Sequence, residues 1–276
     1  MSPIKAAVRA ARRRAVELLA AVLCLSLGPG HGNASAWLQP QGHAQVITTF
    51  TYHSSRGSFD DKGNSVTLQY QRFELAPYIE YGAATWLTLG AEPRYQWAQS
   101  GSGSARQPSD GIGDVDVFAR VPLPKFGPWV TSIQGTAIFA DAYDRLRRPA
   151  PGTGRDAYEA RLLVGRNLSP RSASHFNLEA GYRMGQAGVA DQIRFDGALG
   201  LKRWRRWLFL QEIFITQSIG DGDGVPGHAY DLTKLRSSAV YSLTERLGIQ
   251  AGYERDIAGS GVSLGDTGLV AIWAQF

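Results

Sequence analysis

The sequence predicts an all-β protein, a transmembrane antiparallel up-and-down β-barrel of about 12 strands. Three observations predict it: an N-terminal export signal, segments of about ten residues in which apolar and polar side chains alternate, and a final strand that ends on an aromatic residue. Alternation with a period of two is typical of a strand with two different faces. No segment after the export signal approaches the length of a transmembrane helix, so crossing a membrane requires a closed barrel.

The first 36 residues have the features of a cleaved secretory signal peptide. Five basic residues between Lys5 and Arg14 precede an apolar run from Ala15 to Leu27. A small-x-small cleavage motif follows and ends at Ala36. We therefore expect residues 1–36 to be removed, with Trp37 as the first residue of the mature chain, and residues 37–276 to form one outer-membrane barrel domain.

Removal of the signal peptide changes what the composition implies. The chain has 29 basic and 24 acidic side chains, of which five and one lie in the first 36 residues. The remaining 24 and 23 nearly cancel, so nucleic acid is not an expected partner. The only cysteine, Cys24, leaves as well, and Asp221-Gly-Asp223-Gly lacks the terminal glutamate of a calcium loop. No metal or cofactor is expected.

Twelve strands are predicted from the alternation and from the Gly-, Ser-, Pro- and Asp-rich segments between them. We place them at residues 44–54, 66–81, 86–97, 113–123, 129–140, 157–168, 175–185, 191–202, 207–218, 231–243, 247–258 and 265–276. Tight turns near 82–85, 124–128, 169–174, 203–206 and 244–246 alternate with longer loops at 55–65, 98–112, 141–156 and 219–230. Short turns at one end and longer loops at the other are typical of outer-membrane barrels.

The last strand ends on Phe276, and Gly268, Val270, Ile272 and Ala274 share its face. This ending resembles the C-terminal strand of bacterial outer-membrane β-barrels, in which a terminal Phe and spaced apolar residues are read by the barrel-assembly machinery. The resemblance implies that Phe276 is an assembly signal. It also implies a location in the outer membrane of a Gram-negative bacterium, with outer-membrane lipid and lipopolysaccharide as surroundings.

The two faces of the strands differ in charge. In residues 113–123, Val115, Val117 and Ala119 share one face, while Asp114, Asp116 and Arg120 share the other. Because Arg or Lys facing the bilayer midplane costs about 2–4 kcal/mol, the charged face is expected to point into the lumen. The predicted lumen-lining residues are Glu92, Arg94, Asp114, Asp116, Arg120, Glu159, Arg161, Glu179, Arg183, Arg194, Asp196, Glu212, Arg236, Glu254 and Asp256.

Two interpretations of this interior remain open. Opposite charges stand two residues apart at Glu92 and Arg94, at Glu159 and Arg161, and at Arg194 and Asp196. Such pairs either line a narrow passage that selects polar solutes or oligomers, or fill the lumen of a structural or accessory barrel. The mixed signs argue against a strongly anion-selective pore.

Aromatic residues support the membrane assignment. Six tryptophans fall at or near the ends of predicted strands, as in the aromatic girdles of membrane proteins: Trp86, Trp97, Trp129, Trp204, Trp207 and Trp273. Tyr78 and Phe118 are instead on faces that point to the lumen, where they either fill space or contact a solute.

An enzymatic alternative rests on His53 and Ser55. Their spacing resembles that of outer-membrane phospholipases and lipid A deacylases, in which a histidine activates a serine two residues away. No Asn follows Ser55 as in those families, and no orienting acid is evident. We therefore expect no enzyme, with a lipid hydrolase as the third hypothesis.

Two further resemblances concern the substrate. Gly111-Ile-Gly-Asp114 resembles the beginning of a strand in outer-membrane transporters grouped with phenol-degradation pathways. Residues 36–46 and 73–82 are similar to proteobacterial proteins of the XagA type, associated with exopolysaccharide and biofilm loci. These resemblances imply a channel or export component, with polysaccharide or small polar solutes as partners.

Overall fold

The computed structural model describes residues 36–59, 65–101, 106–140, 149–152, 155–169, 172–224 and 228–276. Apart from Ala36, the predicted signal peptide lies outside these residues. No helix in the described ranges is long and apolar enough to cross a membrane.

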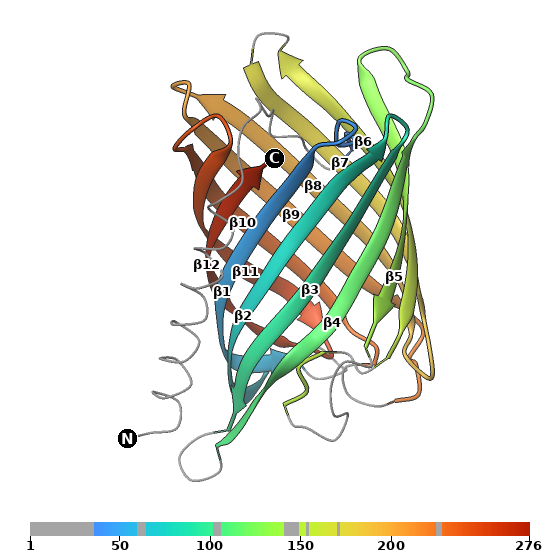
Figure 1. Ribbon diagram of the computed structural model, residues 1–276. Helices are drawn as coiled ribbons and strands as arrows, with labels where there is room; N and C mark the ends of the chain where they lie inside the picture. The colour runs from blue at the N-terminus through green and yellow to red at the C-terminus, as the bar shows by residue number, and fades with distance from the viewer. Residues whose placement is uncertain are drawn as a thin grey trace.

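The fold is a closed antiparallel barrel of twelve strands, as predicted (Figure 1). Every strand pairs with its neighbours in the sequence, and the first strand also pairs with the last. The strands are β1 (Ala44–Phe59), β2 (Ser65–Ala84), β3 (Leu87–Ser100), β4 (Gln107–Pro122), β5 (Trp129–Phe139), β6 (Ala157–Ser169), β7 (Ser172–Gly185), β8 (Asp191–Arg203), β9 (Trp207–Ile219), β10 (Asp231–Ser242), β11 (Leu247–Ser260) and β12 (Ser263–Gln275).

The two ends of the barrel differ in their connections. The turn end carries the tight turns 85–86, 123–128, 204–206 and 243–246, together with the junction of β1 and β12. The loop end carries the connections that follow the odd-numbered strands (Figure 1). Two loops are shorter than predicted, because β1 continues to Phe59 and β3 to Ser100. Their Gly- and Ser-rich sequence indicated loops, but pairing with neighbouring strands extends the hairpins, since strand propensity depends on context.

Side chains alternate between the lumen and the outer surface along each strand. On β4, Val117 is 44% exposed on the outer face, whereas Phe118 and Arg120 are buried on the inner one. On β11, Ile249 and Tyr253 are exposed, whereas Gln250 and Glu254 are buried. This polarity is the reverse of a soluble protein and fits a barrel whose outer face contacts hydrocarbon.

The facing of β4 leads to a prediction. Val117→Arg should destabilise the barrel by about 2–4 kcal/mol, because it places a charge on the outer face near the middle of the strand. Urea unfolding of protein refolded in lipid vesicles measures this loss. Val117→Leu is the matched control, and Asp116→Asn, one residue away on the inner face, should leave the barrel folded. A larger loss for Asp116→Asn than for Val117→Arg would contradict the assignment of the faces.

Candidate functional site

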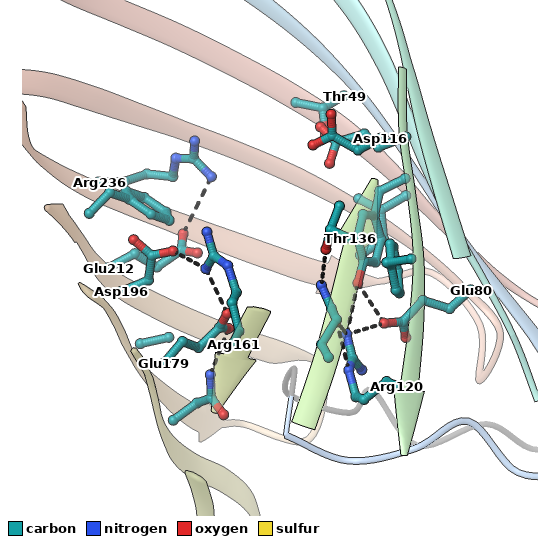
Figure 2. A pocket seen from close by; sticks show the side chains of 18 of the residues that line it. Thr49, Glu80, Asp116, Arg120, Thr136, Arg161, Glu179, Asp196, Glu212 and Arg236 are labelled. Carbon is teal, nitrogen blue, oxygen red and sulfur yellow. Dashed lines mark hydrogen bonds and ion pairs between the residues drawn. The ribbon is translucent and has the colours of Figure 1, made fainter. Parts of the chain in front are cut away.

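The lumen contains a cavity of about 440 Å³ lined by residues from all twelve strands. Figure 2 shows two groups of polar side chains that face each other across it, one with Arg161, Asp196 and Arg236 and the other with Glu80, Asp116 and Arg120. Twelve of the fifteen predicted lumen residues lie in its wall: Glu92, Arg94, Asp116, Arg120, Glu159, Arg161, Glu179, Arg183, Arg194, Asp196, Glu212 and Arg236.

Arg161 on β6 connects three neighbouring strands. Its guanidinium pairs with Glu159 on the same strand, with Glu179 on β7 at 2.9 Å and with Asp196 on β8 (Figure 2). Only 10% of the Arg161 side chain is exposed. The antiparallel register explains why Arg161 reaches both carboxylates. Glu179 on β7 is paired directly with Asp196 on β8, and Arg161 is paired with Gly181, two residues from Glu179 on the same face of β7.

Glu159 is a second centre of the same network. Its Oε2 accepts from Arg183 Nε at 2.7 Å and from Arg194 Nη1 at 3.3 Å, and Arg161 binds the other carboxylate oxygen. Three cations therefore surround one carboxylate that is 2% exposed. In such a network, charges of opposite sign offset the cost of removing each charge from bulk water.

Smaller ion-pair groups occupy the rest of the wall. Asp116 accepts two hydrogen bonds from Arg94, at 3.1 and 3.0 Å, and Arg94 also lies 3.2 Å from Glu92. Between β9 and β11, Arg236 lies 3.9 Å from Glu212 and its guanidinium carbon is 4.8 Å from the centre of the Phe214 ring. These groups distribute both signs of charge around the cavity.

Arg120 is the largest fully buried side chain among the described residues, with 1% exposed. It forms an ion pair of 2.8 Å with Glu80 and donates to Gln134 Oε1 from Nε and Nη2. Tyr78 accepts from Arg120 at 3.2 Å and donates to Glu80 at 2.5 Å. The group joins β2, β4 and β5 near the turn end.

Residues 36–41 cross the mouth of the lumen at this end. Gln39 anchors the segment, because its backbone N donates to Thr88 Oγ1 at 2.9 Å. Its side-chain amide donates to Glu80 at 2.7 Å and to Gln45 at 3.1 Å. Gln39 is buried, so these hydrogen bonds are formed away from bulk solvent.

The beginning of this segment reaches the opposite strands. Ala36, the last residue of the predicted signal peptide, donates from its backbone N to Asn177 Oδ1 at 3.2 Å. Within the predicted mature chain, Arg120 donates to the carbonyl oxygen of Trp37 at 3.1 Å, and the Trp37 ring is 6.3 Å from that of His175 on β7, measured between centroids. A Cβ at Gly165 would lie 2.3 Å from the Trp37 ring, so only glycine leaves space for it there. Segment 36–41 therefore contacts β1, β2, β3, β4, β6 and β7 and narrows the mouth at the turn end.

Three predicted residues lie inside the barrel but outside the wall of the cavity. Asp114 packs against Gly152, and a Cβ there would meet its carboxylate. Glu254 is buried and accepts from Lys234 at 3.2 Å and from Arg236 at 2.6 Å. Asp256 accepts from the backbone N of Gly265 at 3.0 Å.

Sequence reasoning missed part of the site. Glu80 and Lys234 share the inward parity of predicted residues on their strands, so the alternation could have identified both. No such signal identified Gln39, because segment 36–41 is neither a strand nor charged.

Trp273 was predicted in the outer girdle, and this is wrong: it faces the cavity and donates from Nε1 to Gln250 at 2.8 Å. Trp273 alternates with the same period as Leu269 and Ala271, which are buried, whereas Val270 is exposed on the outer face.

Tyr78 and Phe118 both line the cavity, and their rings stack with centroids 5.5 Å apart.

His53 and Ser55 do not form a catalytic pair. His53 Nδ1 lies 2.9 Å from Thr267 Oγ1, while the Ser55 hydroxyl donates to the carbonyl oxygens of Gly57 and Leu264. Both side chains are buried inside the barrel rather than presented to lipid.

The fold is similar to that of solved bacterial outer-membrane proteins. The COG4313 outer membrane channel from Pseudomonas putida F1 superposes with a TM-score of 0.70 over 91% of this chain and 100% of that one, at 14% identity. The translocator domain of the autotransporter NalP from Neisseria meningitidis gives 0.54 over 99% and 97%, at 12% identity. The NanC porin gives 0.54 over 83% and 98%, at 9% identity.

At these identities the similarity establishes the fold, which is that of outer-membrane β-barrels. No protein-family model and no curated protein sequence matches the chain. The resemblances to XagA-type proteins and to transporters of phenol-degradation pathways therefore stay predictions.

The network around Glu159 leads to a second prediction. Arg161→Met should lower the free energy of unfolding by about 3–5 kcal/mol, because it leaves Glu159, Glu179 and Asp196 without their shared cation. Arg94→Met is the matched control. It should cost less, since the Arg94 side chain is 24% exposed and serves two carboxylates. Equal losses in urea unfolding would contradict a central role for Arg161.

Proposed function

We propose that this protein is a narrow channel of the bacterial outer membrane for small polar solutes, exported with a cleaved signal peptide. The observation that carries the proposal is the polar lumen, in which six arginines and seven carboxylates surround a cavity of about 440 Å³. Charged side chains around a narrow lumen are a means by which channels select polar solutes.

The partial exposure of charged side chains in the wall supports a hydrated lumen. The Arg183 and Arg194 side chains line the cavity and are 20% and 22% exposed. Because they lie on the inner face, their exposed parts are accessible to water or a polar solute inside the barrel. The size of the cavity and the segment across its mouth favour small solutes over a polysaccharide chain.

A second candidate is an accessory barrel whose lumen is closed. It is favoured by the contacts of segment 36–41 with six strands and by the ion pairs around Glu159. The two candidates differ in conductance, because a closed lumen passes no ions whereas a channel does.

The channel proposal predicts a change in ion selectivity. Arg183→Gln combined with Arg194→Gln removes two cations whose side chains are 20% and 22% exposed, and leaves Arg161 in place. In planar bilayers the wild-type protein should conduct with weak selectivity. The double variant should favour cations, because the remaining carboxylates dominate the local field. Arg255→Gln on the outer face, 66% exposed, is the control and should not change selectivity. A folded wild-type protein without conductance would overturn the channel proposal.

The segment across the mouth leads to a separate prediction. Gln39→Cys combined with Thr88→Cys should form a disulfide, because the backbone N of Gln39 lies 2.9 Å from Thr88 Oγ1 and the predicted mature chain has no other cysteine. The cross-link should lower conductance, and a reducing agent should restore it, if the segment moves when the channel opens. Each single-cysteine variant is a control. Identical conductance before and after reduction would show that this contact does not limit passage.

A further inference from the structure

The turn between β8 and β9 has an unusual backbone. Trp204 and Arg205 have φ angles of 45° and 57°, and among the described residues Ala187 is the only other non-glycine residue with positive φ. Bulky side chains rarely adopt this conformation, which Gly and Asn adopt readily. Backbone strain of this kind persists where the surrounding structure enforces it, and it is frequent at functional sites.

The strained turn presents aromatic and cationic side chains together. Trp204 is 78% exposed, and Arg203, Arg205 and Arg206 are exposed beside it. Arg206 donates to the Tyr241 hydroxyl at 3.3 Å. We call this surface the Trp204 patch, and its residues are Arg203, Trp204, Arg205, Arg206, Trp207, Phe209 and Tyr241.

The aromatic part of the patch continues onto the wall of the barrel that faces the bilayer. Phe209 lies between Leu208 and Leu210, which are buried on the inner face, so its ring points outward. The Phe209 ring is 6.0 Å from that of Trp207 and 6.1 Å from that of Trp204, measured between centroids. A molecule bound at the arginines would therefore have an apolar surface below it, at the depth of acyl chains.

The charge of the patch selects the kind of partner. In the described turns at this end, the only acidic residue is Glu245, against four basic ones: Lys125, Arg205, Arg206 and Arg246. The β2–β3 turn differs, because it exposes Trp86 without any basic residue. The β4–β5 turn has Lys125 beside the exposed Phe126, and Arg166 lies over the Trp129 ring nearby. Among the described turns at this end, the β8–β9 turn differs from both because it combines three arginines with its outward rings.

We infer that the Trp204 patch binds the headgroup of an anionic phospholipid of the inner leaflet, because the short turns of outer-membrane barrels are on the periplasmic side. The arginines contact the phosphodiester, and Trp207 and Phe209 contact the upper part of the acyl chains. An acidic protein surface would also pair with the arginines, but it would not contact the outward rings of Trp207 and Phe209. The inference does not depend on whether the lumen conducts.

Native mass spectrometry of the refolded full barrel, titrated with phosphatidylglycerol or phosphatidylcholine, tests the inference. The wild-type protein should retain phosphatidylglycerol preferentially, and this preference should fall with salt. The triple variant Arg203→Gln, Arg205→Gln, Arg206→Gln should lose it by at least about tenfold, since each basic residue near an anionic lipid surface contributes about fivefold. Lys125→Gln and Trp86→Ala are controls and should change it less than about twofold.

A second variant separates lipid binding from stability. Trp204→Asn combined with Arg205→Gly should raise the thermal midpoint of the barrel, because both new residues adopt positive φ more readily than Trp and Arg. The same variant should weaken retention of phosphatidylglycerol. Unchanged retention in this variant and in the triple variant would overturn the inference. So would equal retention of the two lipids by the wild-type protein, or the same loss in Lys125→Gln as in the triple variant.

Discussion

The structure depends on the closure of the barrel between β1 and β12. In hydrocarbon an unpaired backbone N–H or C=O costs several kcal/mol, so a sheet with free edges is not stable there. The pairing runs from Gln45 opposite Gln275 to Ser58 opposite Ser263, and the backbone groups of Ala44 and Phe276 hydrogen-bond to each other at the turn end. This register joins the first strand to the last, so every strand has two neighbours.

Closure also decides where charge is located. Because one face of each strand contacts lipid, charged side chains collect on the other face and are enclosed together. Enclosed charges are stable only in compensating groups, and the structure provides these through residues on adjacent strands. Arg161 on β6 meets carboxylates from β7 and β8 because the hairpins place them at the same height. The same groups leave space between them, and this space is the cavity of the proposed channel.

The turn end of the barrel carries two features besides its short connections. At the turn end, segment 36–41 lies across the mouth inside the barrel, while the strained Trp204 turn projects arginines and aromatic rings outside it. Both features depart from the simplest barrel, in which short turns only reverse the chain. Each is held by specific contacts, Gln39 with Glu80 and Thr88 within, and Arg206 with Tyr241 outside.

The sequence by itself determined the fold class, the twelve strands and the inner face of the strands on which the predicted lumen residues lie. These follow from a period of two and from the cost of charge in hydrocarbon, both local properties of the chain. Tertiary structure decided which charges meet, because Arg161 and Asp196 are 35 residues apart and come together only through the register of β6, β7 and β8. It also decided the place of segment 36–41. That segment has no strand periodicity, and its position depends on hydrogen-bonding groups and on space beside Gly165 that exist only in the closed barrel.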